Sequence, residues 1–111
     1  MEISQHKENG VAVLTLKGRL DTLASPILEK KLCDLITETE CRFLVDFSQL
    51  DFISSSGLRV LLLVAKQLKC VHGKIILCGL HKNVKEVFDI AGFSQLFKIF
   101  PSQNEAMKEL Q

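Results

Sequence analysis

The sequence predicts a single α/β domain, in which about four helices pack on a mixed, partly parallel sheet of four or five strands. Strand-like and helix-like segments alternate along the chain, as they do where crossover helices join parallel strands. The 111 residues suit one domain with one core, and no repeat, linker or low-complexity tract divides residues 1–111. Apolar residues make up 47% and charged residues 24%, an ordinary balance for a globular domain.

The first two strands are expected to form a hairpin. Residues 11–17, VAVLTLK, are apolar and β-branched with partial alternation, which indicates a strand ending at Gly18. The dipeptide Asn9-Gly10 favours a tight turn. Residues 3–7 are therefore expected to pair with the strand at 11–17.

A helix and a buried strand follow. Residues 22–38 carry apolar side chains at helical spacing, with Leu28, Leu32 and Leu35 on one face. Residues 42–47, RFLVDF, form a short apolar run that is typical of a strand buried on both faces. The order strand, helix, strand predicts a parallel crossover here.

The central part of the chain repeats this order. Residues 57–69 predict a second helix, and residues 74–79, KIILCG, predict a second buried strand. The inward stripe of the helix is expected to be Leu58, Leu61, Leu62, Ala65 and Leu68.

The last third of the chain predicts a short helix at 82–91 capped by Gly92, a strand at 96–100 before Pro101, and a terminal helix at 102–110. The inward residues of the two helices are expected to be Val84, Val87, Phe88 and Ala91, and Ala106, Met107 and Leu110.

Charge and hydropathy argue against a nucleic-acid partner and against a membrane span. The net charge of +1 argues against direct nucleic-acid binding through a broad basic surface. The longest apolar run, residues 60–65, is far too short to span a membrane. The polar start MEISQHKENG lacks the apolar core of a secretion signal, so a cytoplasmic location is expected.

The cysteines are expected to be reduced thiols, because they are spread out and nothing indicates secretion. One group of residues has the side-chain types that bind zinc: Cys70, His72, Cys78 and His81. Their spacing is not that of the familiar zinc fingers, so no metal is expected.

Three consecutive serines, Ser54, Ser55 and Ser56, stand between a strand-like segment and the second helix and are followed by Gly57. In sheets of this kind, functional sites gather at such turns. One serine is enough to cap the helix, which stabilises it by about 1 kcal/mol. A hydrolase is not favoured, because the G-x-S-x-G elbow needs glycine where Ile53 stands. The phosphate-loop patterns GxxxxGK[ST] and GxGxxG are absent, so no nucleotide cofactor is expected.

Phosphorylation is the remaining possibility for the triplet. A hydroxyl beside a helix N-terminus can carry a dianion at little electrostatic cost, because free N–H groups and the helix dipole favour negative charge there. The fold should persist, while the small-residue patch gains about two negative charges. Gly57 is interpreted as part of that patch, since it has no side chain to hold a partner's backbone away.

Four stretches, in this order and at this spacing, resemble the STAS-domain anti-sigma factor antagonists of bacteria over nearly the whole chain. The resemblance implies a single STAS domain over residues 1–111, with the phosphorylated serine at the start of the second helix. The four stretches are Gly18-Arg19-Leu20-Asp21, VDFSQLDFISSSGLRVLL, HGKIILCGL and VFDIAGFSQLFKIF.

The resemblance further implies partner switching. In its unphosphorylated form the antagonist binds an anti-sigma factor that is also a serine kinase of the histidine-kinase-like ATPase fold, and the sigma factor is released. The kinase inactivates the antagonist by phosphorylating it, and a PP2C-type phosphatase restores it. The chain itself is expected to be no enzyme. The alternative is a non-catalytic STAS scaffold subunit of a stress-signalling or lipid-transport assembly.

The family pattern D-S-[ST]-G, in which the first hydroxyl residue is modified, implies phosphorylation of Ser55. Ser56 and Ser54 are rivals, because Ser54 stands where the family usually has Asp. Asp21 matches the aspartate of the pattern G-x-L-D, with a helix cap as the alternative role. Leu58 is equally well interpreted as a core residue. The partner-binding residues implied are Asp21, Ser54, Ser55, Ser56, Gly57, Leu58 and Arg59.

Overall fold

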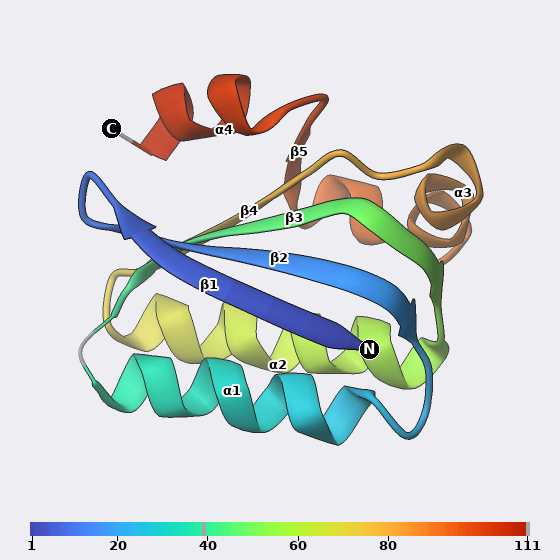
Figure 1. The fold of residues 1–111 in the computed structure, drawn as a ribbon, viewed down its shortest axis with the longest axis horizontal. Coiled ribbons are helices and arrows are strands. Elements are labelled where there is room, and N and C mark those ends of the chain that lie inside the picture. The colour runs from blue at the N-terminus through green and yellow to red at the C-terminus, as the bar shows by residue number, and fades with distance from the viewer. Residues whose placement is uncertain (39, 111) are drawn as a thin grey trace.

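The computed structural model describes residues 1–38 and 40–110, so positions 39 and 111 of the predicted domain lie outside the described part. The predicted α/β fold, with a mixed sheet and four helices, is confirmed (Figure 1). The strands are β1 (Glu2–Glu8), β2 (Val11–Leu20), β3 (Arg42–Ile53), β4 (Lys74–Cys78) and β5 (Lys98–Phe100). The helices are α1 (Ser25–Thr37), α2 (Ser55–Cys70), α3 (Lys82–Ile90) and α4 (Gln103–Leu110), with a 3-10 helix, η1, at Phe93–Gln95.

The strands follow the order β1-β2-β3-β4-β5 across one sheet. β1 and β2 are antiparallel and are joined through Asn9 and Gly10, whose φ angles of 53° and 78° suit the tight hairpin turn that the sequence predicts. The other pairings are parallel, so β2, β3 and β4 all end at the same edge of the sheet. The connections into α1, α2 and α3 leave from that edge.

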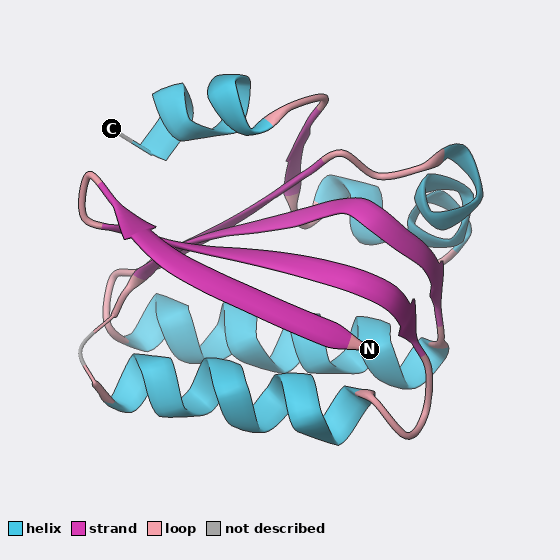
Figure 2. Cartoon of the chain, in the orientation of Figure 1, coloured by secondary structure: helices cyan, strands magenta, loops and turns pink. Residues whose placement is uncertain are grey.

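Helices cover both faces of the sheet (Figure 2). α1 and α2 pack against one face, and α4 packs against the other. Alternation along β2 supplies both faces with apolar side chains: Ala12, Leu14 and Leu16 belong to the core under α1 and α2. Val11 and Val13 belong to the smaller core under α4.

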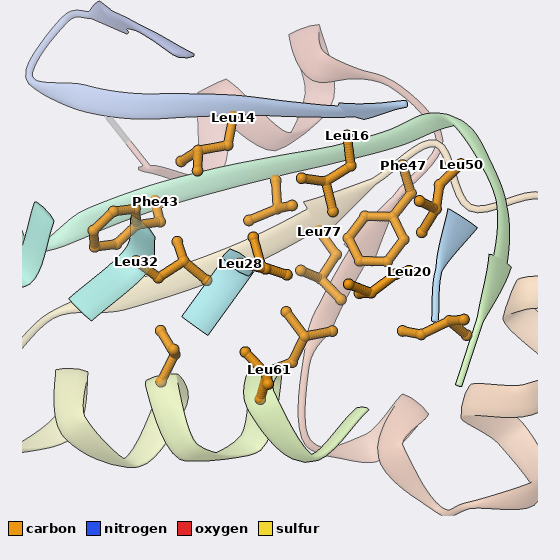
Figure 3. Close-up of a cluster of buried hydrophobic side chains, with 14 of the residues drawn as sticks. Leu14, Leu16, Leu20, Leu28, Leu32, Phe43, Phe47, Leu50, Leu61 and Leu77 are labelled. Carbon is orange, nitrogen blue, oxygen red and sulfur yellow. The ribbon is translucent and has the colours of Figure 1, made fainter. Parts of the chain in front are cut away.

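The larger core fixes α1 and α2 on the sheet (Figure 3). Leu28 and Leu32 of α1 share it with Leu61 of α2, and all three are fully buried. Burying a leucine side chain of this kind contributes about 1.5–3 kcal/mol to folding. Phe88 of α3 packs edge-on against Phe47 of β3, with ring centroids 6.0 Å apart. Leu58 and Leu61, in the first two turns of α2, both belong to this core, so the start of α2 packs against the sheet.

β2 and β3 run further than the sequence predicts. The strands expected at 11–17 and 42–47 end only at Leu20 and Ile53. Two register shifts lie between the paired strands, one after Thr15 and one after Gly18, and each adds a residue to β3, so they break the apolar alternation by which that strand is predicted while the pairing continues beyond them. The extension carries both strands to the point where the serine triplet begins.

The buried stripe of α2 differs from the predicted one. Val60 and Val64 are buried, whereas Leu62 and Ala65 are only half-buried. The reason is that α2 packs on α1 as well as on the sheet, so its apolar face is wider and turned toward the neighbouring helix.

The C-terminal third follows the prediction with two differences. Gly92, at φ 77°, ends the α3 region as expected for a C-terminal cap. Ala91, expected to point inward, is exposed, and the strand expected at 96–100 begins only at Lys98, because residues 96 and 97 form the turn that follows η1. Within residues 1–38 and 40–110, no helix has the length and apolar character required to cross a membrane.

A buried carboxylate ties α4 to the sheet. Asp46 of β3 accepts hydrogen bonds from the Ser48 backbone N–H at 2.8 Å and from Gln103 Nε2 of α4 at 2.6 Å. Burial, together with the neighbouring Asp46 carboxylate, raises the pKa of the Cys78 thiol to about 12. This thiol is therefore protonated at neutral pH, and all four cysteines are free.

Candidate functional site

The candidate site forms where β2 and β3 end side by side. Their last residues, Leu20 and Ile53, are paired in the sheet, and the Ser54 N–H donates to the Leu20 carbonyl oxygen at 2.9 Å. Because the two strands are parallel, the loops that follow them leave the same edge. Asp21 and the serine triplet are brought together in this way.

Ser54 caps α2. Its backbone is extended, with φ −89° and ψ 167°, and its Oγ accepts a hydrogen bond from the Gly57 N–H at 3.1 Å. Such a cap contributes about 1 kcal/mol to the stability of the helix. The capping role, which the sequence left open among three serines, belongs to Ser54.

A chain of hydroxyl groups joins the start of α2 to the start of α1. Ser54 Oγ lies 2.8 Å from Ser56 Oγ, and Ser56 Oγ lies 3.2 Å from Ser25 Oγ. Ser25 Oγ in turn donates to the Asp21 carbonyl oxygen at 2.7 Å. A carbonyl oxygen only accepts, so the one hydroxyl hydrogen of Ser25 is used there and Ser56 donates to Ser25. By the same reasoning Ser54 donates to Ser56, and every hydrogen in the chain has a fixed acceptor.

Ser55 stands outside this chain. It is the first residue of α2, it is exposed, and its hydroxyl has no hydrogen-bond partner among residues 1–38 and 40–110. Ser54 and Ser56, by contrast, are half-buried and their hydroxyls are engaged. The first turn of α2 contains no acidic side chain that would oppose a negative group there. A group transferred to Ser55 would break none of the hydrogen bonds of the triplet.

Gly57 faces the core, so its interpretation as part of an exposed patch is wrong. It is buried, and a Cβ atom at this position would lie 2.8 Å from Leu20 Cγ and 3.0 Å from Ile53 Cγ1. Glycine is required here for α2 to approach the strand ends. Leu58 is 5% exposed and belongs to the core, whereas Arg59 is exposed.

Asp21 acts as a local cap. Its Oδ1 accepts a hydrogen bond from the Ala24 N–H at 2.9 Å, and its carbonyl oxygen accepts from the Ser25 N–H at 3.0 Å. These bonds hold a turn over residues 22–24, so α1 begins at Ser25 rather than at the predicted residue 22. Asp21 thus caps the turn that leads into α1, while the N-cap position of α1 itself is Ala24.

Exposed apolar side chains lie at the start of α1, the helix that the Ser25–Ser56 contact joins to α2. Leu23 is 84% exposed and Ile27 is 60% exposed. Apolar side chains grouped on the surface beside polar residues are typical of protein–protein contact sites. A groove of about 200 Å³ separates the two helices here and is lined by Thr22, Ser25, Pro26, Glu29, Ser56, Arg59, Val60 and Leu63.

The four residues of zinc-ligand type do not come together. Cys70 and His72 precede β4, whereas Cys78 and His81 lie at and beyond its far end. A strand of five residues is about 17 Å long, which separates the two pairs. In the part of the chain that the structure describes, no three His, Cys, Asp or Glu residues are grouped so that they could hold a metal ion.

Fold and site together define a small α/β domain that presents one free serine hydroxyl at a helix N-terminus, with exposed apolar side chains at the start of the neighbouring helix. The STAS domain profile matches residues 2–106, and the chain belongs to the STAS-domain family. It is 40% identical over 106 residues to BtrV of Bordetella bronchiseptica, a protein named provisionally as an anti-sigma factor antagonist. This alignment covers 96% of the chain and 91% of BtrV.

Solved structures have the same fold. The unphosphorylated anti-sigma factor antagonist SpoIIAA is 23% identical, with a TM-score of 0.87 over 98% of this chain and 96% of that chain. The phosphorylated form of SpoIIAA from Bacillus is 22% identical, with a TM-score of 0.79 over 99% of this chain and 100% of that chain. The fold that the sequence resemblance implies is therefore confirmed.

Two features of the site were not predicted from the sequence. Ser25 is 2% exposed and anchors the hydroxyl chain, but its partner Ser56 lies 31 residues away, so no local pattern reveals the contact. Leu23 and Ile27 are four residues apart at the start of a predicted helix and off its apolar face. That offset is the signal by which their exposure could have been found.

Proposed function

We propose that this chain is an anti-sigma factor antagonist controlled by phosphorylation of Ser55. Its unphosphorylated form binds an anti-sigma factor that is also a serine kinase, and the sigma factor is released. Phosphorylation by that kinase ends the interaction, and a PP2C-type phosphatase restores the binding form. In this account the chain is a cytoplasmic, non-catalytic partner that holds no cofactor.

The free hydroxyl of Ser55 is the observation that carries the proposal. Its neighbours Ser54 and Ser56 have their hydroxyl hydrogens committed, while Ser55 is exposed and unbound in the described structure. A kinase must bring the acceptor oxygen within bonding distance of a phosphoryl group, which favours a hydroxyl that is accessible and free. The names of BtrV and SpoIIAA support the same class of function.

The mechanism of the switch is electrostatic. Phosphate on Ser55 adds about −1.5 to −2 charges at pH 7, and the N-terminal end of α2 tolerates them. Exposed Leu23 and Ile27 lie at the start of α1, the helix whose Ser25 contacts Ser56 of α2. A partner whose apolar surface covers the start of α2 must then desolvate a dianion, so it dissociates while the domain stays folded.

The experiment is a mass measurement on the intact chain after incubation with its cognate kinase and ATP. We expect a gain of one phosphate that Ser55→Ala abolishes and that Ser54→Ala and Ser56→Ala retain. Phosphorylation that persists in Ser55→Ala would move the acceptor to Ser54 or Ser56. No phosphorylation by any kinase of the native cell would favour the non-catalytic scaffold subunit instead.

A further inference from the structure

Arg59 lies one helical turn beyond Ser55 on α2, at the i+4 position, and both residues are exposed. Side chains at this spacing are neighbours, with Cβ atoms about 5–6 Å apart. Arg59 also borders the groove between α1 and α2, next to Ser56. A group attached to the Ser55 hydroxyl therefore comes within reach of the Arg59 guanidinium.

Arg59 differs from the other two arginines of the chain. Arg19 lies over the Phe52 ring, with its Cζ 4.2 Å from the ring centroid, and Arg42 donates to the Leu110 carbonyl oxygen at 2.7 Å. Arg59 forms no ion pair, hydrogen bond or ring contact with any other residue in the described part of the chain. Its guanidinium is available for a new partner.

We propose that Arg59 is the internal counter-ion of a phosphate on Ser55. This inference rests on the proposed function and adds a residue to its switch. An acidic group four residues N-terminal to a basic one is the favourable order on a helix. A guanidinium also matches two phosphate oxygens in a bidentate contact that a lysine ammonium does not reproduce.

Two carboxylates lie close enough to oppose the phosphate. Glu29 of α1 borders the same groove as Arg59, and Asp21 lies in the adjoining loop. Neither forms an ion pair with Arg59 in the described structure. Phosphorylation would thus engage a cation that is unpaired beforehand, and the partner-facing surface would lose a free guanidinium as it gains the phosphate.

The test uses phosphoserine installed at position 55 by genetic-code expansion, so that it needs no kinase. The second pKa of the phosphate is measured by phosphorus NMR in the parent chain and in Arg59→Gln, Arg59→Lys and Lys66→Gln. Removing a favourable i,i+4 charge should raise this pKa by about 0.2–0.4 unit in Arg59→Gln, with Arg59→Lys in between. Lys66 lies eleven residues from Ser55, about 16 Å along the helix axis, and its variant should match the parent.

The difference between the parent and Arg59→Gln should also shrink in high salt, because the pair is exposed. A phosphate pKa in Arg59→Gln equal to that of the parent, with both chains folded by their amide spectra, would overturn the inference. Failure of the kinase to phosphorylate Ser55 would instead overturn the proposed function. That result would leave the outcome of this titration unchanged.

Discussion

Ser25 Oγ of α1 and Ser56 Oγ of α2 lie 3.2 Å apart and connect the first turns of the two helices that cover one face of the sheet. The contact has a direction, because the Ser25 hydrogen is already donated to the Asp21 carbonyl oxygen and only Ser56 has one to give. The series of hydrogen-bonded hydroxyl groups thereby fixes the hydroxyls of Ser54 and Ser56 and leaves that of Ser55 free. A helix–helix contact selects which serine is presented.

Ser25→Ala should destabilise the domain by about 1–2 kcal/mol, because it leaves the half-buried Ser56 hydroxyl without its acceptor. Urea denaturation measures the change. Ser55→Ala is the matched control, since its hydroxyl is exposed and unbound, and it should alter stability by no more than about 0.5 kcal/mol. Equal losses in the two variants would show that the chain of hydroxyls contributes nothing.

Gly57→Ala should also destabilise the domain, although alanine favours helix formation by up to about 1 kcal/mol over glycine. The new Cβ would lie 2.8 Å from Leu20 Cγ, and overpacking of this kind typically costs about 1–3 kcal/mol. In a Leu20→Ala background the same substitution should cost less, because the obstructing side chain is gone. Denaturation of the parent, the two single variants and the double variant measures the coupling free energy between positions 20 and 57. A Gly57→Ala variant that is more stable than the parent would contradict the close packing of Gly57 on Leu20.

The elements of the fold were predictable where apolar periodicity is local. The helices at 22–38, 57–69 and 82–91 and the strand at 74–79 were placed within a few residues, because each carries an unbroken 3.6-residue or β-strand pattern. Strand ends were less predictable. The pairing of Leu20 with Ile53 comes after bulges that interrupt the alternation, so it depends on contacts between distant segments.

The site was predictable in position but not in detail. The serine triplet stands at a strand-to-helix turn, which marked it as a candidate. The sequence did not indicate which serine is free, because this depends on Ser25, a residue of another helix. The sequence also led to the wrong face for Gly57. A glycine that lets a partner approach cannot be distinguished in a sequence from a glycine that lets the core pack closely.

The Cys78 thiol should make stability fall at alkaline pH. Its pKa is raised in the folded chain from 9.0 to about 12, so folding favours the protonated form. This contribution is complete below about pH 9 and is lost as the pH rises from about 9 to about 12, because the unfolded chain ionises first. Between about pH 8 and about pH 10.5, the unfolding free energy should fall more in the parent than in Cys78→Ala. Equal losses would contradict the assigned shift.

Leu23→Asp should weaken binding of the partner without weakening the fold. Leu23 is 84% exposed, so the substitution should change stability by no more than about 0.5 kcal/mol. A carboxylate in place of an apolar side chain that the partner covers should lower the affinity about tenfold or more, as measured by titration calorimetry. Val71→Asp, at the other end of α2 and 50% exposed, is the control and should bind like the parent. Equal affinities for the parent, Leu23→Asp and Val71→Asp would show that the partner does not contact Leu23.

The most direct measurement compares the unmodified chain with the chain phosphorylated on Ser55, in partner affinity and in unfolding free energy. We predict that the affinity falls at least about tenfold, while the unfolding free energy changes by less than about 1 kcal/mol, because the N-terminus of α2 accommodates the charge. Unchanged affinity would contradict the account. So would a loss of affinity that comes with unfolding of the domain.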